Sequence, residues 1–392
     1  MGWMDSSAVW AARIALRVAA ERLSPRDAVG LDDVPTSVAR ITPSWWTAVL
    51  CRDVPGAEVV SVATVGASSG THQRHRFALT YNAAGAAAGL PRAVFTKSLP
   101  TVVTRMIGGY NGTARAEGRF YTELRPRLDI ESPHGYHAAF DRRSLAGINV
   151  LEDIVATRDA HFCDFRTLVT RPMAESMVDL LADLHGHRFG DTTLTRDYRW
   201  LANFADWFAI GARKMGTERY TARAMRVMAE RIPRAIVDRA GEIWPRTVAA
   251  AAVHRAQPTS VLHSDVHIGN WYQHGDGRMG LTDWQCVAHG HYARDLAYML
   301  ATALAVDDRR AWERALIERY VERLSARAGQ DIAFDDAWLR YREQMLHALW
   351  MWTITLCHSP LLPAMQPEDT SRELITRICT AMADLDSLDV PA

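Results

Sequence analysis

The sequence predicts an α+β fold made of two lobes, the first rich in β-strands and the second mainly helical. The chain has 392 residues, which is too long for one typical hydrophobic core. Short β-rich segments follow one another between Glu58 and Leu151, separated by turn residues. Beyond Pro172 most segments have helical periodicity, apart from a β-rich stretch between Ser260 and Thr282.

The region before Glu58 is expected to form a helical cap on the first lobe. Ala8–Leu23 places apolar residues on one helical face and arginines on the other. Thr42 followed by Pro43 is typical of a helix start, so a second helix is predicted to run through Val49.

The β-rich region is predicted to hold several strands, with one helix between the third and the fourth. The segments with strand character are Glu58–Val65, Gln73–Tyr81, Ala93–Lys97, His137–Phe140 and Ile148–Leu151. Gly66–Thr71 is rich in small residues and is expected to be a loop. Thr113–Leu124 is expected to be the helix, ended by Pro126.

The second lobe is expected to be mainly helical. Apolar residues in Met173–Leu184 recur at helical spacing, and Pro172 suits the first turn of that helix. Further helices are predicted at Trp200–Ile210 and Ala222–Arg231, and over most of the chain after Ala311.

One stretch of the second lobe carries a distinctive set of polar residues. Its predicted strands are Ser260–Leu262, Trp271–Gln273 and Met279–Thr282. Turn residues between the last two favour a hairpin, which would carry Asn270 at one foot and Asp283 at the other. Because the strands of a hairpin lie side by side, these two oxygen-bearing side chains are expected to be neighbours.

Those side chains suit a magnesium ion in contact with phosphates. Mg²⁺ prefers hard oxygen ligands and keeps several waters, so one carboxylate and one amide suffice when a substrate supplies phosphate oxygens. Asp265 precedes Asn270 by five residues, the spacing between the catalytic Asp and the metal-binding Asn of protein kinases. A carboxylate there can accept the proton of a hydroxyl that attacks a γ-phosphate. The alternative is a polar loop in which Asp265 caps a helix and Asn270 sits in a turn.

The stretch resembles the aminoglycoside phosphotransferase and choline kinase superfamily, and within it the ecdysteroid-kinase-like branch. The matching residues are His263-Ser264-Asp265-Val266-His267-Ile268-Gly269-Asn270 and Asp283-Trp284-Gln285. The resemblance implies a bilobal protein-kinase-like fold, with a small antiparallel-sheet lobe containing one main helix and a larger, mainly helical lobe. It implies that Asp265 is the catalytic base and that Asn270 and Asp283 bind Mg²⁺. His263 is expected to support the loop, and His267 to have a surface or packing role.

The resemblance also implies nucleotide-binding roles in the first lobe. The small-residue loop would cover the ATP phosphates with its backbone N–H groups. The loop residues concerned are Ser68, Ser69 and Gly70. Lys97 would reach the α- and β-phosphates and pair with Glu117, with Glu123 as the alternative partner. From the residues alone, an ordinary hairpin loop and a solvent-facing lysine are the alternatives.

Leu151–Ile154 resembles the hinge of the same superfamily, where backbone groups bind the adenine edge. Glu152 and Ile154 are therefore candidate nucleotide-binding residues. We place the lobe boundary after Ile154, which gives a nucleotide-binding lobe at 1–154 and a catalytic and substrate-binding lobe at 155–392.

Two further phrases match the superfamily. Tyr292–Tyr298 contains Asp295, which is expected to cap a helix and steady the catalytic loop. Leu180–His185 is expected to be a core helix in which His185 is a buried packing residue.

The composition excludes several classes of protein. Lys plus Arg and Asp plus Glu both total 45, so the net charge is zero, which argues against a nucleic acid partner. The five cysteines are scattered and odd in number, which argues against a disulfide framework and fits the cytoplasm. Arg13 and Arg17 argue against a signal peptide, and the longest apolar stretch, Met345–Leu356, is too short to span a membrane.

The implied function is transfer of the γ-phosphate of ATP, with Mg²⁺, to a hydroxyl of a small molecule. No Ala-Pro-Glu segment follows Asp283, which weighs against a protein kinase. A non-catalytic pseudokinase that binds nucleotide and a phosphotransferase for aminoglycosides or other polar metabolites are the alternatives. The sequence departs from the superfamily at Ser264, where Gly is usual, and at Trp284 and Gln285, which replace the Phe and Gly of the kinase D-F-G element.

The substrate is expected to be a largely apolar alcohol. Polycationic aminoglycosides need a pocket lined by carboxylates, whereas the helices of the second lobe are rich in large aromatic side chains. These are Trp200, Phe204, Trp207, Trp338, Tyr341, Trp350 and Trp352. Most are expected in the core and a few along a pocket. Met345–Leu356 is apolar on nearly every face and is expected to be buried.

Overall fold

The computed structural model describes residues 2–70, 72–256, 258–358 and 364–391. The chain forms two compact units. Unit 1 comprises Met1–Arg127 and Pro133–Ala160, and unit 2 comprises Leu128–Ser132 and His161–Ala392. The units part after Ala160, whereas the predicted boundary falls after Ile154, the first residue of the short helix α6 (Ile154–Arg158) of unit 1.

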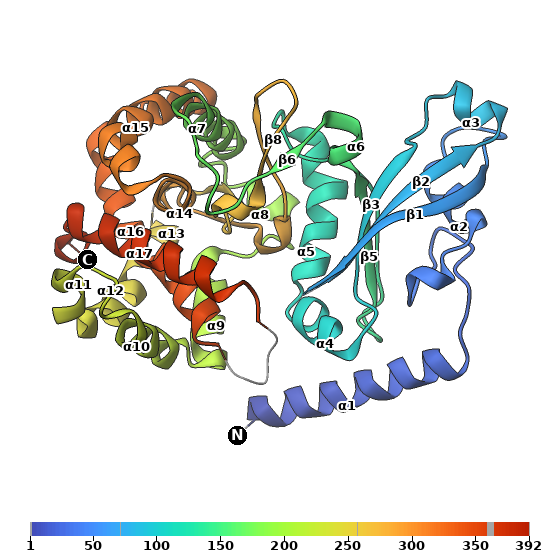
Figure 1. Ribbon diagram of the computed structural model, residues 1–392, viewed down its shortest axis with the longest axis horizontal. Helices are drawn as coiled ribbons and strands as arrows, with labels where there is room; N and C mark the ends of the chain where they lie inside the picture. The colour runs from blue at the N-terminus through green and yellow to red at the C-terminus, as the bar shows by residue number, and fades with distance from the viewer. Residues whose placement is uncertain (1, 71, 257, 359–363, 392) are drawn as a thin grey trace. The chain divides into compact units, whose positions relative to one another are not determined.

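Unit 1 is built on a five-stranded antiparallel sheet with the strand order β1-β2-β3-β5-β4 (Figure 1). The strands are β1 (Val59–Ser69), β2 (Gln73–Tyr81), β3 (Ala93–Ser98), β4 (Gly135–Phe140) and β5 (Gly147–Glu152). Every strand predicted for this region is present. β1 lies at an edge of the sheet and extends further than predicted, because its pairing with β2 continues to the tip of the hairpin.

The helices of unit 1 are mostly short. They are α1 (Gly2–Leu23), η1 (Val38–Arg40), α2 (Pro43–Leu50), α3 (Ala83–Ala87), α4 (Val102–Thr104), η2 (Arg105–Tyr110), α5 (Thr113–Arg119), η3 (Phe120–Leu124) and η4 (Arg125–Arg127). Thr42 caps α2 by accepting a hydrogen bond from the Trp45 N–H at 3.1 Å, as predicted. The expected helix at Thr113–Leu124 is present, with a π-helical second half. Pro126 does not end it, since the chain continues into η4.

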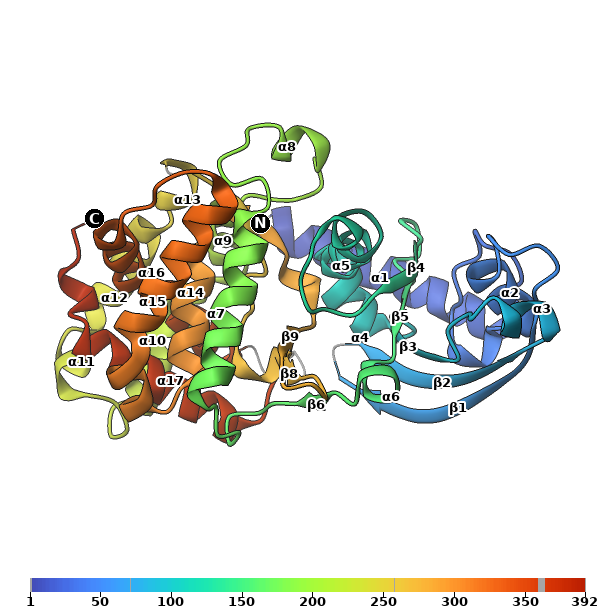
Figure 2. The ribbon, with the colours of Figure 1, turned by 90° about the horizontal axis from the view of Figure 1, so that it is seen from above.

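The helices of unit 2 surround two small sheets. The helices are α7 (Arg171–Gly186), α8 (Leu194–Asp197), α9 (Phe204–Met215), α10 (Thr217–Met228), α11 (Arg234–Asp238), α12 (Ala240–Ala250), α13 (Val253–Ala256), η5 (Ile268–Asn270), η6 (Trp284–Cys286), α14 (Ala293–Ala303), α15 (Val306–Ala328), α16 (Phe334–Leu356), α17 (Glu368–Asp384) and η7 (Ser387–Asp389). The strands are β6 (His161–Phe162), β7 (Ser260–Leu262), β8 (Trp271–Gln273), β9 (Met279–Leu281) and β10 (Ala288–Gly290). Figure 2 shows α7 alongside α15.

The boundaries of two predicted helices in unit 2 are wrong at both ends. The helix expected to begin at Trp200 begins at Phe204, because the Asn203 side chain caps it by accepting from the Ala205 N–H at 2.9 Å. The helix expected at Ala222–Arg231 is α10, which begins at Thr217 and ends at Met228. No helix within the described ranges is long and apolar enough to cross a membrane.

The core of unit 2 contains α14, in which every residue is buried, and most of α16. The predicted burial of Met345–Leu356 is confirmed for most of its side chains. Phe204, Trp350 and their neighbours form one hydrophobic cluster, and the His347 ring packs edge-on against Phe204 with ring centroids 5.1 Å apart.

Buried histidines in this core make the fold sensitive to acid. Burial lowers the pKa of His254 and His347 well below the usual value and lowers that of His291 to about 3. Below pH about 6.5 the unfolded chain therefore binds protons that the folded chain does not. The stability that the folded chain gains from keeping these histidines neutral is complete above that pH. It is lost progressively as the pH falls towards 3.

We expect the free energy of unfolding to fall by up to about 1.4 kcal/mol per pH unit for each of these histidines below pH about 6.5. Urea unfolding measured at a series of pH values from neutral to acidic tests this. His347→Gln should reduce the slope, whereas His161→Gln, at an exposed position of β6, should leave it unchanged. An equal slope in all three proteins would contradict the assignment.

Candidate active site

The predicted hairpin is present as β8 and β9, joined by the expected turn. Just beyond its open end, the Thr282 N–H and the Thr282 hydroxyl both donate to the Asn270 carbonyl, at 2.9 and 3.0 Å. Asn270 immediately precedes β8 and Asp283 immediately follows Thr282. The two residues therefore leave the same end of the hairpin, and their predicted proximity is confirmed.

The Asn270 side chain is fixed with its oxygen available. Its Nδ2 donates to the Asp265 backbone carbonyl at 2.7 Å, and its Oδ1 accepts no hydrogen bond from the part of the chain that the structure describes. Asp283 has a φ of +66°, a left-handed conformation that Asp adopts more readily than most residues. One amide oxygen and one carboxylate fit the needs of a Mg²⁺ ion that also binds waters and phosphates.

The loop before Asn270 is held by α14. Ser264 has a φ of +65°, in the region that favours glycine. The Asp295 carboxylate accepts from the His263 N–H at 2.7 Å and from the Ser264 N–H at 3.0 Å, and Arg294 Nη2 donates to the Ser264 carbonyl at 2.8 Å. These bonds hold Ser264 in the conformation that the usual glycine adopts without strain.

Asp295 steadies the loop, as predicted, but it does not cap its own helix. Burial alone would raise its pKa. The hydrogen bond from His185 and the charge of Arg294 outweigh burial, so the pKa of Asp295 is lowered. His185, expected to be a packing residue, is buried and also bonds the Tyr320 hydroxyl at 2.6 Å.

His263 has the supporting role that was predicted. Its Nε2 donates to the Thr282 carbonyl at 2.8 Å, and its Nδ1 accepts from the Asp265 N–H at 3.1 Å. Burial lowers the pKa of His263, so the ring is neutral with its proton on Nε2. His263 thereby links the loop to the end of the hairpin.

Asp265 presents a carboxylate that is 14% exposed. Its Oδ1 accepts from the Tyr298 hydroxyl at 3.1 Å, and its Oδ2 lies 3.4 Å from Asn270 Nδ2. The next helix, η5, is capped by His267, whose Nδ1 accepts from the Gly269 N–H, so the interpretation of Asp265 as a helix cap is wrong. His267 is buried and packs edge-on against Trp352, as expected of a packing residue.

Unit 1 carries a buried ion pair between β3 and α5. Lys97 Nζ lies 2.7 Å from Glu117 Oε1, and Asn149 Nδ2 donates to Glu117 Oε2 at 3.2 Å. The predicted pairing of Lys97 with Glu117 is present, and Glu123 pairs with Arg119 instead. Lys97 is 5% exposed and Glu117 is fully buried, so the interpretation of Lys97 as a solvent-facing residue is wrong.

The loop predicted at Gly66–Thr71 is wrong from Gly66 through Ser69. These residues belong to β1, where Ser68 lies opposite Arg74 and Ser69 opposite Gln73. An edge strand with exposed faces accepts such small side chains, and antiparallel pairing satisfies its backbone on one side. At the tip of the hairpin the Gly70 N–H donates to the His72 carbonyl at 3.0 Å. Thr71 and the Ser69 side chain lie outside the described residues.

The predicted hinge residues lie at the end of β5 and the start of α6. The Glu152 carboxylate accepts from Arg158, from Thr157 and from the His134 N–H, and these bonds lower its pKa against the opposing effect of burial. Ile154 is buried, and its carbonyl accepts the Ala160 N–H at 3.3 Å. The Glu152 carboxylate is therefore occupied by hydrogen bonds within unit 1. This is the arrangement expected if only backbone groups of this segment contact a nucleotide.

Comparison with known proteins identifies the family. A model described as the phosphotransferase enzyme family matches residues 96–343, which is more than half of the chain. The chain belongs to the phosphotransferase enzyme family. The matched range includes Lys97, Asp265, Asn270 and Asp283. A search of curated proteins found no match.

The fold of this phosphotransferase resembles that of a solved choline kinase. A choline kinase from Cryptosporidium parvum Iowa II has a TM-score of 0.51 at 11% identity, covering 86% of this chain and 93% of that one. An aminoglycoside phosphotransferase from Streptomyces rimosus has a TM-score of 0.43 at 16% identity, covering 74% and 92%. The choline kinase LicA from Streptococcus pneumoniae has a TM-score of 0.43 at 12% identity, covering 83% and 94%. The phosphotransferase has a kinase-like α+β fold, as predicted.

Sequence reasoning assigned no role to two side chains of this phosphotransferase that lie beside predicted site residues. Tyr298 bonds Asp265, and its position three residues after Asp295 on one helix could have indicated this. Arg74 lies opposite Lys97 in the pairing of β2 with β3. Its Nη1 lies 3.2 Å from where a Cβ on Gly70 would be, which brings a cation to the hairpin tip.

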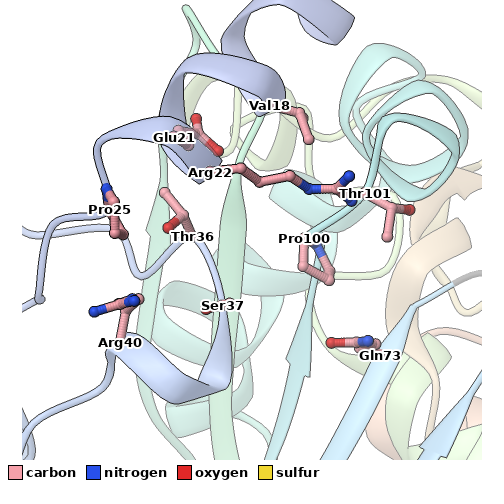
Figure 3. A pocket seen from close by; sticks show the side chains of 10 residues that line it. All are labelled: Val18, Glu21, Arg22, Pro25, Thr36, Ser37, Arg40, Gln73, Pro100 and Thr101. Atoms are coloured by element: carbon pink, nitrogen blue, oxygen red, sulfur yellow. The ribbon is translucent and has the colours of Figure 1, made fainter.

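A separate cavity of about 350 Å³ lies in unit 1 (Figure 3). It is bordered by Val18, Glu21, Arg22, Pro25, Thr36, Ser37, Arg40, Gln73, Pro100 and Thr101. Figure 3 shows the Arg22 side chain extending towards Thr101. The Glu21 carboxylate is bound by the buried Arg105 at 2.9 Å. The border contains none of the residues predicted to bind nucleotide.

Removing Lys97 from this phosphotransferase should cost stability as well as activity. Lys97→Ala leaves the Glu117 carboxylate buried without its opposite charge, which should lower the free energy of unfolding by about 3 kcal/mol. Adding Glu117→Gln should restore most of that stability but not affinity for ATP. Urea unfolding and calorimetric ATP titration of both variants check this. Unchanged stability in Lys97→Ala would contradict the buried pair.

Proposed function

We propose that this phosphotransferase is a small-molecule kinase that transfers the γ-phosphate of ATP to a hydroxyl group. The arrangement of Asp265, Asn270 and Asp283 carries the proposal. Asn270 and Asp283 leave the same end of one hairpin, and the partly exposed Asp265 carboxylate lies beside Asn270. Membership of the phosphotransferase enzyme family and the buried Lys97–Glu117 pair support it.

In the proposed reaction, the oxygen of the acceptor hydroxyl forms a bond to the γ-phosphorus and passes its proton to the Asp265 carboxylate. The bond from the γ-phosphorus to the β–γ bridging oxygen breaks, and ADP leaves. Lys97, oriented by Glu117, binds the α- and β-phosphates. Asn270 and Asp283 would hold Mg²⁺, which when bound neutralises charge on the β- and γ-phosphates.

We propose the ecdysteroid-kinase-like branch on the pattern His263–Asn270 followed by Asp283–Gln285. The presence of a base, metal ligands and lysine favours an active enzyme over a pseudokinase. We also propose that the enzyme acts in the cytoplasm, which the free thiol state of all five cysteines supports.

We retain a largely apolar alcohol as the proposed substrate, with a polar metabolite as the alternative. Phe204, Tyr341, Trp350 and Trp352 are buried and pack within unit 2, so they give no support to an apolar pocket. The remaining candidates to line one are the partly exposed side chains of Trp200, Trp207 and Trp338. Neighbouring enzymes were solved with streptomycin and with hygromycin B. The substrate test therefore includes polar metabolites as well as apolar alcohols.

The test is ADP release from Mg-ATP by the full chain in the presence of sterols, lipid alcohols, choline, ethanolamine and aminoglycosides. Mass spectrometry should find one product heavier than its alcohol by a phosphoryl group. Efficient phosphorylation of kanamycin but of no apolar alcohol would overturn the substrate proposal. Failure to bind Mg-ATP in calorimetry would overturn the kinase proposal itself.

A further inference from the structure

Helix α14 contacts the loop that carries Asp265 through three side chains on one helical face. Asp295 accepts the His263 and Ser264 N–H groups, and Arg294 donates to the Ser264 carbonyl. The third contact is the Tyr298 hydroxyl, 3.1 Å from Asp265 Oδ1. Arg294 and Asp295 hold the backbone of the loop, whereas Tyr298 bonds the carboxylate itself.

Tyr298 is built to act as a hydrogen-bond donor. Its side chain is 1% exposed, and burial raises its pKa well above the usual value, so the hydroxyl stays protonated. The Arg294 guanidinium lies 5.0 Å from the centroid of the Tyr298 ring and helps to fix its plane. An ionised carboxylate only accepts, so the phenol donates to Asp265.

The other Asp265 oxygen has looser contacts. Oδ2 lies 3.4 Å from Asn270 Nδ2 and 3.9 Å from His267 Nε2. At these distances any hydrogen bond to Oδ2 is weak. A carboxylate can rotate about its last bond, and such rotation would turn the basic oxygen away from an acceptor hydroxyl. The hydrogen bond from a rigid, buried phenol restricts that rotation.

We propose that Tyr298 is a positioning residue that fixes the Asp265 carboxylate through Oδ1 and leaves Oδ2 for the proton of the acceptor hydroxyl. This inference rests on the proposed function, in which Asp265 is the base. Tyr298 touches neither substrate nor nucleotide in this role. Its removal should slow the chemical step without weakening ATP binding, because orientation of the base matters only once the acceptor attacks.

The test compares the full-length wild type with Tyr298→Phe, which keeps the ring and removes the hydroxyl. Turnover is measured as ADP release from Mg-ATP with water as acceptor, and with any alcohol found by the substrate panel. We expect kcat to fall by about tenfold, as for loss of a hydrogen bond to a charged group, with KM for ATP changed less than about twofold. Melting temperatures show whether the variant is folded.

Tyr292→Phe is a matched control. Tyr292 is a buried tyrosine at the N-terminus of the same helix, and its hydroxyl has no hydrogen-bond partner among the residues that the structure describes. The kcat of Tyr292→Phe should equal that of the wild type. If Tyr298→Phe shows the same kcat as Tyr292→Phe, the inference is overturned while the proposed function stands.

A double-mutant cycle separates positioning from a general structural effect. If Tyr298 acts through Asp265, adding Tyr298→Phe to Asp265→Asn should cause no further loss of the residual rate. A further tenfold loss in that background would overturn the inference. A wild type that releases no ADP under any condition would instead refute the proposed function, and the inference with it.

Discussion

Replacing Asp265 by Asn should lower kcat by about a thousandfold while changing the affinity for Mg-ATP by less than about threefold. The proposed base accepts a proton from the acceptor hydroxyl, which an amide cannot do. The nucleotide is held by other groups, so its binding should persist. Steady-state ADP release gives kcat, and isothermal calorimetry gives the affinity for Mg-ATP.

Asp331→Asn is a suitable control for this substitution. Asp331 is exposed and lies between α15 and α16. The control should match the wild type in both measurements. Turnover of Asp265→Asn within tenfold of the wild type would show that Asp265 is not the base.

Local sequence patterns predicted the parts of the site that depend on short-range structure. The β8–β9 hairpin follows from two short apolar runs with turn residues between them, and its formation alone places Asn270 near Asp283. The pairing of Lys97 with Glu117 joins residues 20 positions apart and depended on family resemblance, because periodicity alone allowed Glu123. Gly118 lets α5 pack closely against the sheet, because a Cβ at this position would lie 2.8 Å from Asn149 Oδ1.

Contacts between distant segments were beyond the reach of the sequence. Asp295 was expected to cap a helix because it lies near the start of one, but its carboxylate bonds the backbone at His263, 32 residues earlier. Gly66–Ser69 were expected to form a loop from their small side chains, but pairing with β2 keeps them extended. A contact between distant segments decided the role of Asp295, and pairing within the β1–β2 hairpin decided the conformation of Gly66–Ser69.

The aromatic residues show the same limit for the substrate. Composition shows that unit 2 contains many large rings, but it cannot separate those in the core from those facing a ligand. Trp350 packs against Phe208 with ring centroids 4.8 Å apart and donates its Nε1–H to Thr217 at 3.0 Å. Such side chains stabilise the packing of the helices. They carry no information about the chemical class of the acceptor.

Replacing Asp283 by Ala should weaken Mg-ATP binding by about a hundredfold, the loss expected when a charged metal ligand is removed. Asn270 alone would be left to hold an ion whose main protein charge is gone. Affinity for ATP in the presence of EDTA should change little, because Lys97 remains. Calorimetric titrations with Mg²⁺ and with EDTA, on the same preparation, separate the two effects.

Asp283→Asn separates loss of the charge from strain in the backbone. Position 283 has a φ of +66°, where Ala costs about 1 kcal/mol and Asn is tolerated. We therefore expect Asp283→Ala to melt at a lower temperature than Asp283→Asn, while both lose the magnesium-dependent part of ATP affinity. If Asp283→Asn binds Mg-ATP as tightly as the wild type, Asp283 does not hold the ion. A loss confined to Asp283→Ala would then be due to the backbone alone.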